Sequence, residues 1–225
     1  MITNRGINMI RHAKNTNLTL DYDTHYQGLP VQTGRGPLVS EYLESLKHII
    51  DLSLQQYGRV FAFRLDLRFP AGMHHAYTDN NLVIERFIAS LKAKIRHNRS
   101  KAKEANRHAH DTTVRYAWCR ELGQHSIPHY HLVILLNNDA FCTLGKFEMD
   151  RDNLFNRVHE AWASALDLSV ERVIGLVEFP ENPFYLLQRS NPNSLADFFY
   201  RASYLCKADT KHYGNGVHGF GASRT

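Results

Sequence analysis

The chain has 225 residues, of which 43% are hydrophobic, and a formal net charge of +5 at pH 7. This length suits one domain with a core of its own. Since no apolar run approaches the roughly 18 residues of a membrane span and the polar start lacks the apolar region of a signal peptide, we expect a cytoplasmic protein with no membrane partner. The positive charge points to a polyanionic partner.

The three cysteines, Cys119, Cys142 and Cys206, are far apart and form no CxxC pair. An odd number of widely spaced thiols gives neither a disulfide framework nor a thiolate zinc site. We expect buried free thiols.

An N-terminal arm is expected over residues 1–37, because this stretch has no sustained hydrophobic period and ends in the turn-rich GLPVQTGRGP. We expect the arm to be irregular. Residues 38–225 are then expected to form a single domain. The first element of this domain is a helix over about 39–57, where apolar residues recur at helical spacing.

A strand follows over residues 61–69, where apolar and polar residues alternate until Pro70. This alternation predicts one buried face and one polar face. The polar face carries Arg64, Asp66 and Arg68. These side chains either contact phosphates or form an ordinary solvated face, and the second interpretation is the simpler one.

Asp79 or Asn80 is expected to cap a second helix, whose apolar stripe reaches Ile95 before the helix frays into a basic stretch. Glu104 is the single acid within that stretch. Its first basic residues are Lys92, Lys94, Arg96 and Arg99. They form either a DNA-binding surface or a solvated helix end.

Residues 113–119 and 130–136 are rich in strand-forming residues, which predicts an antiparallel hairpin. The second run is apolar on both faces, so we expect it to be central in its sheet. A helix from about residue 152, a strand over 172–179 and a final helix over about 194–207 follow. The order strand, helix, strand, strand, helix, strand predicts an α+β protein with a ferredoxin-like βαββαβ core, in which helices cover one face of a central antiparallel sheet.

His129 and His131 begin the central strand, and because side chains alternate along a strand, both imidazoles point to the same face. Two such ligands can chelate one cation. A second His-x-His, His108 and His110, lies in a polar loop with nothing to hold it in place. The rigid strand therefore makes the first pair the better candidate for a metal site.

Glu121 ends the preceding strand, so the hairpin can bring it opposite the histidines. An exposed loop carboxylate is the alternative interpretation, and Gln124 and His125 are then substitute third ligands. Two nitrogens and one carboxylate oxygen suit Mn²⁺ or Mg²⁺ at a phosphoryl-transfer site.

Tyr200, Tyr204 and Lys207 fall on one side of a helical wheel, away from the apolar stripe of the final helix. Core packing is the usual explanation of aromatic residues at helical spacing, but other residues already fill this stripe. Phenol ionises near pH 10, so a tyrosine nucleophile needs a nearby cation. Lys207 can supply that cation or can neutralise charge in the transition state.

Glu121, the His129-Tyr130-His131 run and the YxxxYxxK pattern ending at Lys207 together resemble the HUH endonucleases, specifically the two-tyrosine initiators of rolling-circle replication. The likeness is greatest to the filamentous-phage (inovirus) gene II replication-protein family and its prophage relatives. The tail GFGASR also resembles the ending of that group. The resemblance extends over roughly 58–224 and gives no role to the N-terminal arm.

This resemblance implies that a metal held by the histidines positions a phosphate of single-stranded DNA at a replication origin. One tyrosine would attack, leaving a 5′-phosphotyrosine and a free 3′-hydroxyl, and the other would attack at the next cleavage. Tyr204 is expected to attack first, because a YxxK pattern puts the nucleophile three residues before Lys207, and Tyr200 is its partner. The chain has no GxxxxGK[ST] motif, so a host or separately encoded helicase would act beside a polymerase in a bacterial host cell.

Two other functions remain open. A non-catalytic ferredoxin-like module would keep the basic and aromatic contacts to nucleic acid and would act without a metal. A relaxase or transposase of the same chemistry would differ in its substrate rather than in these residues.

Overall fold

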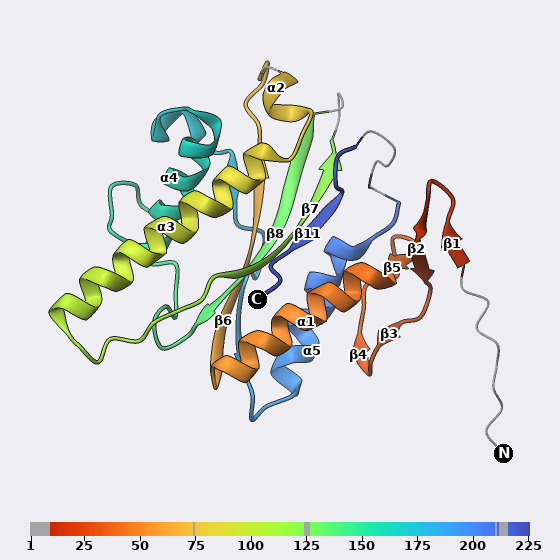
Figure 1. Ribbon diagram of the computed structural model, residues 1–225, viewed down its shortest axis with the longest axis horizontal. Helices are drawn as coiled ribbons and strands as arrows, with labels where there is room; N and C mark the ends of the chain where they lie inside the picture. Colours follow the sequence, from red (N-terminus) through yellow and green to blue (C-terminus); the bar gives the residue numbers. More distant parts are fainter. Residues whose placement is uncertain (1–9, 74, 124–126, 210, 212–215) are drawn as a thin grey trace.

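The computed structural model describes residues 10–73, 75–123, 127–209, 211 and 216–225. An antiparallel sheet runs through its centre, with strand order β10-β6-β8-β7-β11, and β9 also pairs with β6 (Figure 1). These strands are β6 (Arg59–Arg68), β7 (Arg115–Leu122), β8 (Pro128–Asn137), β9 (Val177–Glu178), β10 (Phe184–Gln188) and β11 (Phe220–Ala222). Among the described residues, no helix combines the length and apolarity needed to cross a bilayer.

The helices form two layers, one on each face of the sheet (Figure 1). They are α1 (Ser40–Gln56), α2 (His75–Thr78), α3 (Leu82–Ala105), α4 (Leu154–Leu166) and α5 (Asn193–Ala202). One apolar cluster joins the sheet to α3 and α4, and a second joins it to α1 and α5. The predicted α+β class with a central antiparallel sheet is confirmed. The two helices expected between the strands, α3 and α4, pack on one face as predicted, and α1 and α5 cover the other face.

β6 is buried on both faces, which corrects the prediction of one solvated face. Phe63 and Leu65 pack in the α3–α4 cluster, and Ala62 packs in the α1–α5 cluster. Arg64 and Asp66 lie on the same face of β6 as Ala62 and are only 8% and 9% exposed. Charged groups so deeply buried require polar partners.

The predicted hairpin is confirmed, because β7 and β8 pair in antiparallel fashion. β8 lies between β6 and β7, as its two apolar faces predicted. The strand register places Glu121 opposite His129, and it places Asp66 opposite His131. Three adjacent strands therefore bring these polar residues together at one end of the sheet.

The strand predicted over residues 172–179 is largely wrong. A 3-10 helix, η2 (Val170–Val173), occupies its first part, and β9 is only two residues long. The strand that pairs along β6 is instead β10, which no pattern in the sequence predicted. α4 begins near its predicted start, where the Asn153 side chain accepts a hydrogen bond from the Asn156 amide.

α3 continues through the basic stretch as far as Ala105, so the predicted fraying after Ile95 is wrong. The N-cap of α3 is Asn81, whose side chain makes no capping hydrogen bond, so the predicted cap at Asp79 or Asn80 is wrong. The Asn80 side chain still accepts a hydrogen bond from the Leu82 amide at 2.8 Å. Leu82 itself is 53% exposed and does not belong to the apolar stripe.

The last predicted helix is divided. α5 ends at Ala202, and a tighter 3-10 turn, η3 (Ser203–Cys206), follows. Because a 3-10 turn has about three residues rather than 3.6 per turn, it changes the direction of every later side chain. Tyr200, which precedes the turn, is 44% exposed, whereas Lys207, which follows it, is 2% exposed, so the predicted common side is wrong.

The arm contains more regular structure than expected. Its described part includes β1 (Ile10–His12), β2 (Asn15–Asp21), β3 (His25–Tyr26) and β4 (Leu29–Pro30). β2 also pairs with β5 (Leu38–Val39). The arm is thereby joined to the start of α1.

Two of the three cysteines are buried free thiols, as predicted, and these are Cys119 and Cys206. Burial raises the pKa of the Cys119 thiol to about 12. Cys142 is exposed, so the prediction is wrong for this residue.

Candidate metal centre

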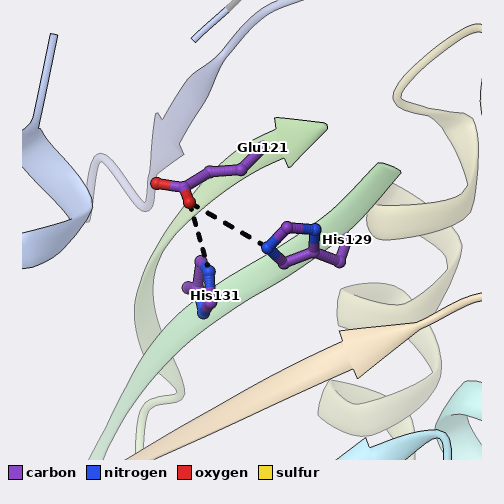
Figure 2. A group of neighbouring side chains, drawn as sticks. All are labelled: Glu121, His129 and His131. Atoms are coloured by element: carbon purple, nitrogen blue, oxygen red, sulfur yellow. Dashed lines mark ion pairs between the residues drawn. The ribbon is translucent and has the colours of Figure 1, made fainter. Parts of the chain in front are cut away.

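Glu121, His129 and His131 form a compact group at the end of the β7–β8 hairpin. One ligand atom from each residue lies within 4.8 Å of the other two. Glu121 Oε2 is 3.5 Å from His131 Nε2 and 3.9 Å from His129 Nε2, and Figure 2 shows this oxygen directed at both imidazoles. Glu121 is 5% exposed, so the alternative of an exposed loop carboxylate is wrong.

Asp66 orients His131 from the neighbouring strand β6. Its Oδ1 atom lies 2.6 Å from His131 Nδ1. Burial by itself lowers the pKa of His131, but the hydrogen bond to Asp66 and the charges of Asp66 and Glu121 outweigh burial and raise it. Burial and the charge of His131 lower the pKa of His129.

These residues fit a divalent cation. His131 Nε2 is buried and has no hydrogen-bond partner among the described residues. With a proton on Nδ1 held by Asp66, the Nε2 lone pair is available to a metal, as in many carboxylate–histidine–metal arrangements. The two nitrogens and one carboxylate oxygen match a site for Mn²⁺ or a related ion that keeps open coordination positions.

Tyr204 joins this group from η3. Its ring packs edge-on against His131, with ring centroids 5.2 Å apart, and its hydroxyl lies 3.5 Å from Glu121 Oε2. Burial first, and then the charge of Glu121, raise the pKa of Tyr204 to about 12. The phenol by itself therefore stays protonated at neutral pH.

Lys207 also reaches the group, from its buried side. Its Nζ lies 3.5 Å from Glu121 Oε1 and 3.5 Å from the centroid of the Tyr204 ring. The two oxygens of Glu121 thus face different partners, one the imidazoles and the other the ammonium. A cation on the ring face favours negative charge on the phenol, so this buried position supports the first of the two roles predicted for Lys207.

Tyr200 is not brought to the same place. It belongs to α5, is exposed, and its backbone carbonyl accepts hydrogen bonds from Gln32 Nε2 and Ser203 Oγ. The structure thus brings one of the two predicted tyrosines to the imidazoles. Gln124 and His125, the predicted substitute ligands, lie outside the described residues.

Arg64 and Arg68 lie on the same side of the sheet as the metal candidates but differ in environment. Arg64 is buried, which lowers its pKa, and its Nε has no hydrogen-bond partner among the described residues. Arg68 is exposed and forms a 2.7 Å ion pair with Glu178. Arg68 also lines a cavity of about 270 Å³ beside His129 and His131.

The basic residues of α3 lie on the opposite face of the sheet from the metal candidates. Lys92 covers the Tyr116 ring, Lys94 pairs with Glu160, and Arg99 covers Phe141. Arg96 is exposed. The structure does not bring these four to the site, and their contact with DNA stays a prediction.

The role of Asp66 was not predicted from the sequence. The alternation of β6 placed Asp66 on the polar face, but alternation cannot tell a buried polar face from a solvated one. The signal that could have found it is the strand register, since Asp66 lies directly opposite His131.

The chain matches the YagK/YfjJ C-terminal domain family over residues 22–223, and it belongs to that family. It is 34% identical over 203 residues to the uncharacterized protein YfjJ of Escherichia coli (strain K12), which covers 84% of this chain and 96% of YfjJ. It is 31% identical over 210 residues to the uncharacterized protein YagK of the same strain, covering 88% of this chain and 97% of YagK. No solved structure matches the chain significantly.

Proposed function

We propose that this protein is a metal-dependent endonuclease of the HUH type, which nicks and rejoins single-stranded DNA through a 5′-phosphotyrosine. The observation that carries the proposal is the position of Tyr204, whose hydroxyl lies 3.5 Å from Glu121 Oε2 and whose ring packs on His131. A potential nucleophile and a potential ligand set, more than 70 residues apart in the sequence, share one place.

The strand order supports the ferredoxin-like core that this class of enzyme would need. We assign its six elements, in chain order, to β6, α3, β7, β8, α4 and β10. The first and third strands, β6 and β8, lie in the middle, and the second and fourth, β7 and β10, lie on either side. This is the arrangement of a βαββαβ unit with two interleaved crossovers.

In the proposed reaction, Glu121, His129 and His131 would hold Mn²⁺ or Mg²⁺. The bound ion would polarise a non-bridging oxygen of the scissile phosphate and would lower the cost of forming a phenolate. Tyr204 Oη would form a bond to phosphorus, and the bond from phosphorus to the 3′ oxygen would break. The phenol loses a proton, the leaving 3′ oxygen gains one, and the 5′ phosphate remains on Tyr204.

Tyr204 and Tyr200 are assigned different roles. Tyr204 would be the first nucleophile, because it already contacts the ligand set. Tyr200 is exposed on α5, so a second attack from it would require a movement of α5 or of the DNA. Lys207 would stabilise the Tyr204 phenolate and would pair with Glu121 Oε1.

The biological role proposed is initiation of rolling-circle replication of a phage, prophage or mobile element in the cytoplasm of a bacterial host cell. Its substrate would be single-stranded DNA at a replication origin. A host or separately encoded helicase and polymerase would complete replication, since the chain has no helicase-type phosphate-binding motif.

The test is a covalent adduct on a denaturing gel after incubation with single-stranded oligonucleotides from candidate origins and Mn²⁺. We expect an adduct with the wild type and with Tyr200→Phe, and no adduct with Tyr204→Phe or after chelation of the metal. Tyr200→Phe is the matched control, because it removes an exposed hydroxyl one helical turn away. An adduct formed by Tyr204→Phe would refute the assignment of the nucleophile.

A non-catalytic nucleic-acid-binding module is the competing proposal. The observation that favours it is the run of basic residues on α3, which lies apart from the metal candidates. If His129→Ala and His131→Ala left DNA affinity and biological activity intact, this second function would be preferred.

A further inference from the structure

One loop of the N-terminal arm, residues 32–38, lies along the segment that carries both tyrosines, residues 200–208. The Gln32 amide donates a hydrogen bond to Ser203 Oγ at 2.9 Å, and Gln32 Nε2 donates one to the Tyr200 carbonyl at 3.1 Å. At the other end of the loop, the Ala208 amide donates to the Pro37 carbonyl at 3.0 Å. The loop therefore holds the tyrosine-bearing segment on both sides of Tyr204.

The contact is close enough to constrain which residues the loop can contain. Gly36 has φ +95°, a conformation that other residues adopt only with strain, and a Cβ atom placed there would lie 2.2 Å from Asp209 Oδ2. Leu38 is fully buried and forms a β-bridge with Lys207. The backbone of the loop thus packs directly against the backbone that positions Lys207.

Arg35 is the exposed residue between the two glycines at the tip of this loop. The loop is joined to the tyrosine segment on either side of Arg35, because the Gln32 amide donates to Ser203 Oγ and the Pro37 carbonyl accepts from the Ala208 amide. Lys207, whose Nζ lies 3.5 Å from the centroid of the Tyr204 ring, is buried, and Arg64 of β6 is buried too. Arg35 therefore offers an exposed guanidinium on the solvent side, where a phosphate can approach.

We propose that the 32–38 loop is part of the functional site, because it fixes the tyrosine segment against the sheet and presents Arg35 to a phosphate of a bound single strand. The identity of this ligand rests on the function proposed above. The fixing of the tyrosine segment does not, since it follows from hydrogen bonds within the chain. The two parts therefore have separate experiments.

The first experiment measures amide hydrogen exchange, which reports local opening of the backbone. Gly36→Ala should speed exchange in residues 203–209 while leaving β8 protected. Gly28→Ala is the matched control, because Gly28 also has a positive φ, +80°, in the same arm, but a Cβ atom at Gly28 would have no neighbour within 4 Å. If Gly36→Ala fails to fold, Gln32→Ala, which removes one side-chain hydrogen bond, should give a smaller increase in the same residues.

Unchanged exchange in residues 203–209 in the folded loop variants would overturn the first part of the proposal. An equal increase in Gly28→Ala would overturn it too, since the effect would then come from backbone strain alone.

The second experiment measures the salt dependence of affinity for a fluorescein-labelled oligo(dT) strand in EDTA. Each phosphate contact contributes a slope of about 0.7 in log Kd against log salt for a single strand. Arg35→Ala should therefore lower the slope by about 0.7, whereas Lys14→Ala, which removes an exposed charge from the same arm, should leave it unchanged.

Equal slopes for the wild type and Arg35→Ala would overturn the phosphate contact, as would a failure of the wild type to bind the strand at all. If the wild type binds with the predicted slope but forms no covalent adduct, the nicking function fails while the contact made by Arg35 stands.

Discussion

Replacing Asp66 with Asn should weaken metal binding without changing any of the three proposed ligands. Asp66 lies 2.6 Å from His131 Nδ1 and is 9% exposed, so the contact is short and shielded from water. An Asn amide can donate to Nδ1, which would put the imidazole proton on Nε2 and remove the lone pair that faces Glu121. Loss of such an orienting partner typically costs 10- to 100-fold in metal affinity, about 1.4–2.7 kcal/mol.

The assay is isothermal titration calorimetry with Mn²⁺ at pH 7.5, comparing the wild type, Asp66→Asn and Glu178→Gln. Glu178 is the matched control, because it is a carboxylate opposite Asp66 on the adjacent strand β9 and makes its ion pair with Arg68 rather than with an imidazole. Glu178→Gln should change the affinity less than threefold, since surface charges are well screened. Equal losses of Mn²⁺ affinity in both variants would show that the loss of a negative charge, and not the orientation of His131, weakens binding. An unchanged affinity in Asp66→Asn would refute the orienting role.

Three further predictions concern stability. Gly221→Ala should lower the free energy of unfolding in urea by about 1–3 kcal/mol, because its Cβ would lie 2.6 Å from the Trp118 ring, whereas Gly58→Ala, with nothing nearby, should not. Burial lowers the pKa of His159 below 6.5, so the unfolded chain binds its proton more readily and stability should fall as pH drops below 6.5. The loss should be smaller in His159→Gln, and equal pH profiles would contradict the burial of a neutral imidazole. Mn²⁺ at 100 times its Kd should stabilise the wild type by about 2.7 kcal/mol in the same unfolding assay, and His129→Ala should lose this gain.

The sequence predicted the middle of the fold better than its edges. The alternation in β6 and the continuous apolar run of β8 are strong signals, and both led to correct strands. β10 was missed because its five residues, FYLLQ, are too few to distinguish from a loop by period alone. The division of the last helix was missed because a helical wheel assumes one constant rotation per residue, which fails where the 3-10 turn begins at Ser203.

The site was predicted to the extent that neighbouring strands determine it. A hairpin of known register brings Glu121 to His129, so the proximity of these two residues followed from the sequence. The position of Asp66 depends on the register of β6 against β8, and the positions of Tyr204 and the 32–38 loop depend on how η3 and the arm pack on the sheet. Such contacts between distant segments leave no periodic signal in one sequence.

The most direct test of the proposed centre is anomalous X-ray scattering from crystals of the protein grown with Mn²⁺. A single strong peak is expected among Glu121 Oε2, His129 Nε2 and His131 Nε2, on the side of the Tyr204 hydroxyl. A manganese peak elsewhere in the molecule, with none at these three side chains, would contradict the proposed metal centre.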